Sequence, residues 1–329
     1  MSFPSFVRSD IDLLQKKFDV GCFHYDPSDR MIPNIRQQIR LFAWLMVRMP
    51  RAVAVYVWFA DYHAFLPVLF SKILKKQSVV VLGGYDVTFI PELKYGVFSN
   101  PIRSFFAAFA IRNAGVLAPV TEELIEKARV RVPVIRGRVV HLPLGFDPSH
   151  WYCDTPKEES VLTVSVAEDG TRLKIKGVDF LIDIARMTPE VPYTVIGVQP
   201  RLRALLKAPP NVRFVDGRIP FSELRGYYSR AKVYAQLSMS EGMPSVVCEA
   251  MLCECIPVGT KIGGIPGIIG DAGYCISDRD PFGAARVIRK AIQAPRKIGE
   301  NARHRIMARF SEESRYRDLV GIIERHGKT

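Results

Sequence analysis

Short runs of β-branched and aromatic residues alternate with segments of helical periodicity along most of this chain. Such alternation predicts βαβ units and parallel sheets. The continuous apolar run AVAVYVWF at 52–59 indicates a strand that is covered on both faces, as in a sheet with helices on each side. The chain is therefore predicted to be an α/β protein with doubly wound sheets.

The expected elements occur in both halves of the chain. We expect strands at 20–25, 52–59, 78–82, 115–118, 139–142, 160–166, 193–197, 212–216, 233–236, 256–259 and 273–275. We expect helices between them, for example at 8–17, 180–186, 221–230, 246–253 and 282–293. A length of 329 residues suits two domains. Prolines, glycine and aspartate at 143–148 predict a linker over 143–155.

The charge is strongly basic, with 46 Lys+Arg against 33 Asp+Glu and a net charge of +13 that is spread over both halves. This balance favours phosphorylated ligands, acidic membranes or nucleic acid, without choosing among them. The six cysteines form no CxxC pair, which favours a reduced, cytoplasmic location. The first residues do not read as a signal peptide, and no apolar run approaches the ~20 residues that span a bilayer.

The most specific segment is SEGMPSVVCEAM at 240–251, between a strand and a helix. Gly242 allows a turn, and Pro244 suits the first position of a helix. The amides of Met243 to Val246 would then point out of a helix amino terminus, where phosphate binds readily. Gly242, Met243, Pro244, Ser245 and Val246 together are called the donor loop. Glu241 and Glu249 flank that site and would bind hydroxyl groups. An ordinary capped helix with two solvated glutamates is the alternative.

The Glu-x7-Glu pattern of Glu241 and Glu249, followed by IPVGTKIGGIPGIIGDAG at 256–273, resembles the donor site of GT4-type retaining glycosyltransferases. Further similar segments occur in the same order along the chain from about residue 115 to 323. They are LPLGFD (142–147), KGVDFL (176–181), NVRFVDG (211–217), the stretch 220–228, and Phe310-Ser311 before a final helix.

The resemblance implies a GT-B fold, with two Rossmann-like doubly wound domains facing a central cleft and a C-terminal helix that crosses back to the first domain. We expect an acceptor-side domain at 1–146, a nucleotide-sugar domain at 147–310, and the returning helix at 311–329. The family opens with a strand and a glycine-rich loop before its first helix. Here SFPSFVRSD resembles the segment just after that strand.

The resemblance also implies roles for individual residues. Glu249 would bind the ribose, Glu241 the transferred sugar, and Lys176 the diphosphate. The family's additional arginine corresponds to Arg172, with Lys174 as the alternative. The donor loop would cradle the phosphates, and backbone at Gly217 and Ile219 would lie against the base.

On the acceptor side, the resemblance points to the segment VVVLGGYD at 79–86. Gly83 stands where the family often has a histidine, and it is followed by Gly84 and Asp86. His63 follows an earlier strand and is either structural or directed to the cleft. Asp278 and Asp280 form a DxD pattern, but in a polar turn, so we expect no metal site there.

The sequence therefore predicts a metal-independent retaining glycosyltransferase without a cofactor. It would move a hexose-type sugar from a UDP- or GDP-linked donor to a glycan, a lipid-linked molecule or another acceptor. The alternatives are a sugar-nucleotide epimerase of the same fold, an inactive transferase-like partner protein, and a nucleic-acid-binding protein. No RNA-binding aromatic pattern is present, so we expect no nucleic-acid partner.

The segment 31–49 is basic and amphipathic, with Arg36 and Arg40 beside Phe42, Trp44 and Leu45. Its apolar residues either pack in the core or dock on an anionic membrane at the inner face. Both interpretations stay open from the sequence.

Overall fold

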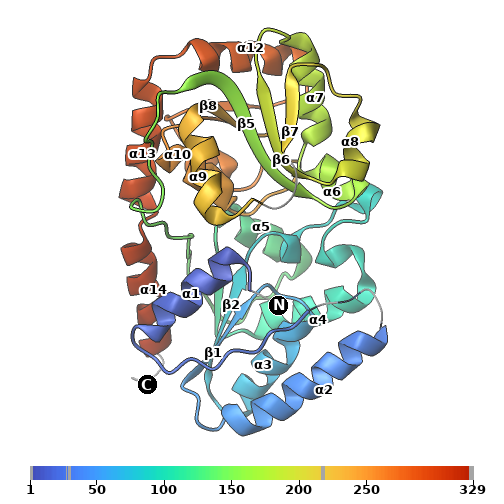
Figure 1. The fold of residues 1–329 in the computed structure, drawn as a ribbon. Coiled ribbons are helices and arrows are strands. Elements are labelled where there is room, and N and C mark those ends of the chain that lie inside the picture. Colours follow the sequence, from blue (N-terminus) through green and yellow to red (C-terminus); the bar gives the residue numbers. More distant parts are fainter. Residues whose placement is uncertain (1–2, 27, 29–30, 216–218, 326–329) are drawn as a thin grey trace. The chain divides into compact units, whose positions relative to one another are not determined.

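The computed structural model describes residues 3–26, 28, 31–215 and 219–325 (Figure 1). The chain forms two compact units. Unit 1 contains Met1–Gly145 together with Glu312–Thr329, and unit 2 contains Phe146–Ser311. The chain thus passes between the units twice, and unit 2 is an insertion into unit 1.

Unit 1 is built on a four-stranded parallel sheet in the order β1-β2-β3-β4. The strands are β1 (Ala54–Trp58), β2 (Gln77–Leu82), β3 (Val116–Pro119) and β4 (Arg138–Val139). Every residue of β2 is buried, as the continuous apolar run QSVVVL suggests for a central strand.

The helices of unit 1 cover this sheet. They are α1 (Ser5–Gln15), α2 (Met31–Arg48), α3 (Tyr62–Ile73), α4 (Pro101–Asn113), α5 (Glu122–Arg131) and α14 (Glu312–Glu324), with short 3-10 turns at Tyr85–Val87, Pro91–Leu93 and Val97–Ser99. Helix α3 packs on β1 and β2, and α2 and α4 pack on α3. Helices α1 and α14 lie side by side although they come from opposite ends of the chain (Figure 1).

A buried ion pair joins α1 to α14. The Arg315 guanidinium donates to both carboxylate oxygens of Asp10, at 2.5 and 2.7 Å, and to the backbone carbonyls of Leu142 and Pro143. Tyr56 and Trp58 on β1 donate to the same carboxylate. Because every charge in this group is hydrogen-bonded, the cost of burying it is offset.

Unit 2 contains a six-stranded parallel sheet in the order β10-β9-β8-β5-β6-β7. The strands are β5 (Glu158–Ala167), β6 (Tyr193–Val198), β7 (Val212–Val215), β8 (Ala231–Gln236), β9 (Ile256–Thr260) and β10 (Tyr274–Ile276). The order reverses at β5, where β6 pairs on one side and β8 on the other. Such a switch point is where ligands of open α/β sheets bind.

Helices lie on both faces of this sheet. They are α6 (Gly170–Ile175), α7 (Val178–Met187), α8 (Pro200–Leu206), α9 (Phe221–Arg230), α10 (Ser245–Leu252), α11 (Ile265–Ile269), α12 (Pro281–Gln293) and α13 (Lys297–Arg309). Helices α7, α8 and α12 share one apolar core with the strands, and α9, α10 and α13 cover the other face. The predicted doubly wound α/β architecture and the C-terminal helix that returns to the first unit are confirmed.

One strand prediction is wrong. Residues 20–25 form irregular chain and pair with no strand among the described residues. The Phe23 ring instead packs against Trp44 of α2, so the apolar residues of this segment cover a helix. None of the helices in the described residues has the length and apolar content needed to cross a bilayer.

Candidate functional site

The predicted donor residues of unit 2 gather where strand β8 ends. Gln236 is the last residue of β8, and the segment 237–244 leads from it into α10. Since the strands are parallel, this is the carboxyl edge of the sheet, next to the switch point at β5.

Glu241 is held by three donors, all of which bind Oε1. Lys176 Nζ lies at 2.7 Å, Ser238 Oγ at 2.7 Å and Gln236 Nε2 at 3.1 Å. Among the described residues, none donates to Oε2. The side chain of Glu241 is 10% exposed, so it is fixed in direction yet reachable at one oxygen. A carboxylate held in this way suits a hydroxyl-bearing ligand.

Lys176 reaches Glu241 because the turn after α6 is pressed against the end of β8. Gly177 has φ +68°, and a Cβ there would lie 1.9 Å from the Leu237 carbonyl oxygen. Only glycine fits both the left-handed conformation and this contact. The Met239 amide donates to the Ile175 carbonyl at 2.7 Å, which ties the two segments together. Residues 65 positions apart are thereby brought into one ion pair.

The amino terminus of α10 lies directly after Glu241. Pro244 precedes the helix and provides no side-chain cap. The Val247 amide bonds to the Pro244 carbonyl, while the half-buried Ser245 and Val246 contribute the first amides of the helix. Gly242, Met243 and Pro244 are buried and form the support of the loop. A helix thus starts at the position where the sequence predicts one, and anion binding there stays a prediction.

A second glycine fixes the loop from the opposite side. Gly263 has φ +57°, and a Cβ there would lie 2.0 Å from the backbone oxygen of Glu241. The Gly264 amide donates to the Gly242 carbonyl at 2.8 Å. The glycine pair of 263–264 therefore supports the backbone of the donor loop.

Glu249 is buried one turn into α10. Its Oε2 accepts a hydrogen bond from the Tyr228 hydroxyl at 3.1 Å, and Ser245 also hydrogen-bonds its side chain. Burial raises the pKa of Glu249 from 4.5 to about 7, and the two hydrogen bonds oppose that rise. This carboxyl group is therefore poised to gain or lose a proton near neutral pH.

The other predicted donor residues within the described part of the chain form no hydrogen bond or ion pair with Glu241 or Glu249. Arg172 and Lys174 are exposed on α6, and the Arg172 guanidinium lies 3.9 Å from the Asp169 carboxylate. Ile219 is half-buried in the turn before α9. Gly217 lies outside the described residues.

In unit 1, Gly83, Gly84 and Asp86 follow the end of β2. The Asp86 carboxylate is buried and accepts from the amides of Ala60, Gly83 and Gly84. Burial raises the pKa of Asp86 to about 6, against the effect of these amide bonds. A Cβ at Gly83 would lie 2.2 Å from the Phe59 ring, so a histidine there would require Phe59 to move. The aspartate thus organises the backbone that joins the ends of β1 and β2.

His63 lies in the first turn of α3, and its ring contacts other residues of unit 1. Its Nε2 is 2.6 Å from the Trp58 carbonyl oxygen, and its ring lies 5.5 Å from that of Tyr25. Burial lowers its pKa, which favours a neutral ring that donates from Nε2. Its Nδ1 is buried and has no hydrogen-bond partner among the described residues.

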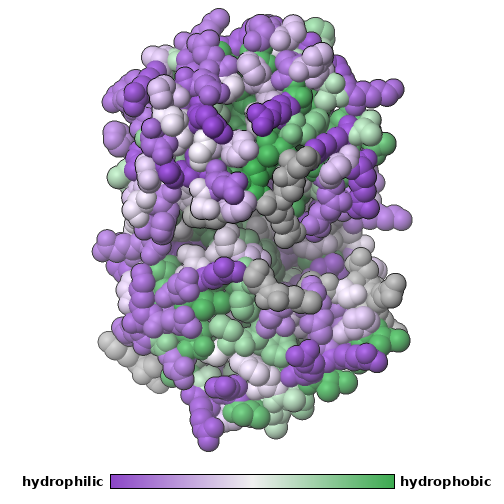
Figure 2. Space-filling view, in the orientation of Figure 1, coloured by the Kyte–Doolittle hydropathy of each residue, from purple (hydrophilic) through white to green (hydrophobic). Residues whose placement is uncertain are grey.

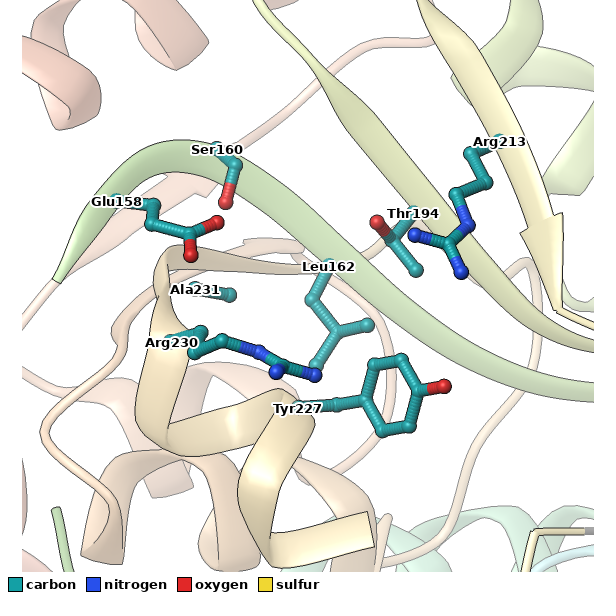
Figure 3. Close-up of a pocket in the computed structure, with 8 residues that line it drawn as sticks. All are labelled: Glu158, Ser160, Leu162, Thr194, Arg213, Tyr227, Arg230 and Ala231. Atoms are coloured by element: carbon teal, nitrogen blue, oxygen red, sulfur yellow. The ribbon is translucent and has the colours of Figure 1, made fainter. Parts of the chain in front are cut away.

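A hollow of about 320 Å³ lies elsewhere in unit 2 (Figure 3). Arg230 and Tyr227 at the end of α9 face Arg213 and Thr194 on the strands, with Leu162 between them. Its strand residues lie near the starts of β5, β6 and β7, so the hollow is at the amino edge of the sheet. It is not the predicted donor site, which lies at the carboxyl edge.

Sequence reasoning missed the side chains that hold the two glutamates. Gln236 and Ser238 orient Glu241, and Tyr228 orients Glu249. Serine three residues before Glu241 is the only local signal. The discounted DxD turn has a structural use, since Asp280 caps α12 by accepting from the amides of Phe282 and Gly283.

Solved structures similar to this chain include glycosyltransferases of the GT-B class. Sucrose-phosphate synthase from Thermosynechococcus elongatus aligns with 93% of this chain and 81% of its own, with a TM-score of 0.77 and 18% identity. Anabaena HepE, determined in complex with UDP-glucose, aligns over 96% of this chain and 88% of its own, with a TM-score of 0.71 and 18% identity. These similarities show that the fold is GT-B.

Residues 157–305 match the family described as "Glycosyl transferases group 1". The matched residues make up most of unit 2, and the resemblance to GT4-type enzymes is confirmed. A phosphatidylinositol N-acetylglucosaminyltransferase component from Arabidopsis thaliana is 26% identical over 144 residues, which are 41% of this chain and 32% of that protein. The chain spans about a third to a half of the length of the first curated relatives that it matches.

Proposed function

We propose that this protein is a retaining, metal-independent glycosyltransferase that takes a hexose-type sugar from a UDP- or GDP-linked donor. The observation that carries the proposal is the pairing of Lys176 with Glu241 at the start of α10. A cation from the turn after α6, a carboxylate and the first amides of α10 are then brought to the same edge of the sheet. These are the groups that a sugar diphosphate requires.

The diphosphate would bind at the Ser245 and Val246 amides and attract Lys176. The Lys176 ammonium would then leave the Glu241 carboxylate and pair with the diphosphate. Glu241 would be free to accept hydrogen bonds from hydroxyl groups of the sugar. When the bond between the sugar and the phosphate breaks, negative charge concentrates on the leaving diphosphate. Lys176 and the helix amides are already directed at that charge, so they stabilise the transition state most. Arg172 would add a second cation after leaving Asp169.

The nucleoside would lie over Glu249. Once it is ionised, its carboxylate can accept hydrogen bonds from the ribose hydroxyls in addition to those from Tyr228 and Ser245. Backbone at Ile219 would lie against the base. In the retaining chemistry of the family, the leaving phosphate takes the proton of the acceptor hydroxyl. We therefore assign no protein side chain as a general base.

The acceptor would meet Gly83, Gly84, Asp86 and His63 in unit 1. Asp86 and His63 are already hydrogen-bonded to backbone, so we assign them the shaping of the acceptor loop and no proton transfer. The relatives support glycans and lipid-linked molecules as the first acceptors to test, because one is named for phosphatidylinositol. HepE, in complex with UDP-glucose, makes that donor the first choice. All six cysteines are unpaired, which supports a cytoplasmic location.

Titration calorimetry with UDP and GDP tests the proposal. Glu249→Ala and Lys176→Ala should each weaken binding of the preferred nucleotide at least roughly tenfold, the equivalent of about 1.4 kcal/mol. Glu241→Ala frees Lys176 for phosphate, so nucleotide binding should be equal or tighter while sugar transfer is lost. Arg213→Ala, at the amino-edge hollow, is the matched control and should change neither. Unchanged nucleotide affinity in both Glu249→Ala and Lys176→Ala contradicts the site.

A further inference from the structure

Helix α2 has two apolar faces, although a surface helix needs only one. Its inner face places Leu41 and Leu45 in the core of unit 1, where Met49, just after the helix, joins them. Five large apolar residues on the outer face are between 48% and 64% exposed. This outer strip consists of Ile32, Ile35, Ile39, Phe42 and Met46.

The spacing of the outer strip follows the helix repeat, with steps of three and four residues, so its members form one continuous line. The strip extends onto α3, because the Phe42 ring lies 5.4 Å from that of Phe70 and Ile73, one turn later, is 67% exposed. Figure 2 shows apolar surface interleaved with strongly polar surface over α2. Scattered exposed apolar residues are normal, but a continuous strip of this length marks an interaction surface.

All the charged residues within α2 are basic. Arg36 and Arg40 are exposed and each follows a strip residue directly, so they line one edge of it. From residue 31 to residue 85 the sequence contains seven Lys or Arg and a single acidic residue, Asp61. Asp61 is buried and paired with Arg103, so it offsets none of the exposed positive charge.

We propose that α2 lies flat on an anionic lipid bilayer, with the outer strip among the acyl chains and Arg36 and Arg40 at the lipid phosphates. An apolar face with a basic edge and no acidic residue matches such a surface. A second copy of the chain fits less well, because pairing two strips would bring two basic edges together with no acid in α2 to neutralise them. The surface differs from the one that the sequence suggests, since Leu45 is in the core and Trp44 is half-buried against Phe23.

Vesicle flotation of the full chain tests the proposal without any transferase assay. The protein should bind vesicles made of equal parts phosphatidylcholine and phosphatidylglycerol, and not pure phosphatidylcholine. Binding should weaken as salt rises, because attraction to a charged surface fades within a Debye length. Both Ile35→Ser/Ile39→Ser and Arg36→Glu/Arg40→Glu should lower the binding by roughly tenfold or more.

Unit 2 provides matched controls for both changes. Leu205→Ser removes an apolar residue that is 73% exposed on α8. Arg286→Glu/Lys290→Glu reverses two exposed charges at the same spacing on α12. Neither control should alter vesicle binding, and thermal melting should show that all variants are folded.

Three results would overturn the docking proposal. They are equal binding to neutral and anionic vesicles, absence of binding to either, or an equal loss in the unit 2 controls. A lipid-free dimer that Ile35→Ser/Ile39→Ser dissociates, as measured by light scattering, would assign the strip to a second copy instead. None of these results bears on nucleotide binding, so the proposed transferase site is tested separately.

Discussion

Glu249 should make the protein less stable as pH rises through the weakly acidic range. Its pKa is about 7 in the folded chain and 4.5 ordinarily. Below 4.5 both states hold the proton, and the residue has no effect. Between 4.5 and 7 the unfolded chain loses the proton while the folded one keeps it, so the free energy of unfolding falls. Above 7 the loss is complete, and the interval corresponds to about 3 kcal/mol.

Glu249→Gln removes this dependence. Glutamine has nearly the same shape, keeps an oxygen for the Tyr228 hydroxyl and cannot ionise. The variant should match the wild type within about 1 kcal/mol at pH 5 and exceed it by about 3 kcal/mol at pH 8. Urea unfolding measures the difference, followed by circular dichroism and by tryptophan fluorescence. Trp151, whose ring lies 5.5 Å from that of Tyr228, reports on this region.

The control is Glu223→Gln, which removes an exposed carboxylate from α9 and should change stability equally little at both pH values. A stability difference between Glu249→Gln and wild type that stays constant from pH 5 to pH 8 would refute the reasoning. So would a variant that is less stable at pH 8, because the buried carboxylate would then be favourable in its ionised form.

Three further outcomes follow from the structure. Arg315→Met leaves the Asp10 carboxylate buried without its cation and should lower the free energy of unfolding by about 3–5 kcal/mol, as measured by urea denaturation. The double variant Arg315→Met/Asp10→Leu should recover much of that loss. Gly263→Ala pushes a Cβ against the Glu241 backbone, so transfer should fall with little change in the circular dichroism spectrum. Sugar transfer should survive EDTA, because Lys176 and helix amides face the diphosphate; loss on chelation and rescue by Mn²⁺ would contradict the proposed phosphate site.

The sheets could be predicted because buried parallel strands are continuous apolar runs, and the run at 52–59 contains β1. The same rule fails at 20–25, where apolar residues pack on a helix and make no strand pairing. Helix α3 is not evident from the sequence, since Pro67 and several aromatic residues lie within it and obscure its periodicity. In α2 the amphipathic pattern shows the helix, but it does not separate the inner apolar residues from those of the outer strip.

The candidate site could be predicted in part from its backbone requirements. A glycine before a proline-initiated helix is a local signal, and so is the Lys176-Gly177 turn. The partners of the glutamates required the fold, since Tyr228 comes to Glu249 from another helix and Lys176 crosses from the turn after α6. The Phe59 ring occupies the space that a side chain at position 83 would need, and no spacing in the sequence reveals this contact.

The Asp10–Arg315 pair has a consequence for the order of folding. Its partners are 305 residues apart in sequence, and closing so long a loop in an unfolded chain is slow and entropically costly. Unit 2 shortens that loop when it folds, because its own ends meet where the Phe146 amide bonds to the Phe310 carbonyl at 2.9 Å. Helix α14 begins at Glu312, directly after the last residue of unit 2, so the folding of unit 2 brings α14 close to the end of the first segment of unit 1 in the chain. During synthesis, Asp10 would have no ion-pair partner until α14 emerges. Unit 2 is synthesised after most of unit 1, but it would complete its folding first.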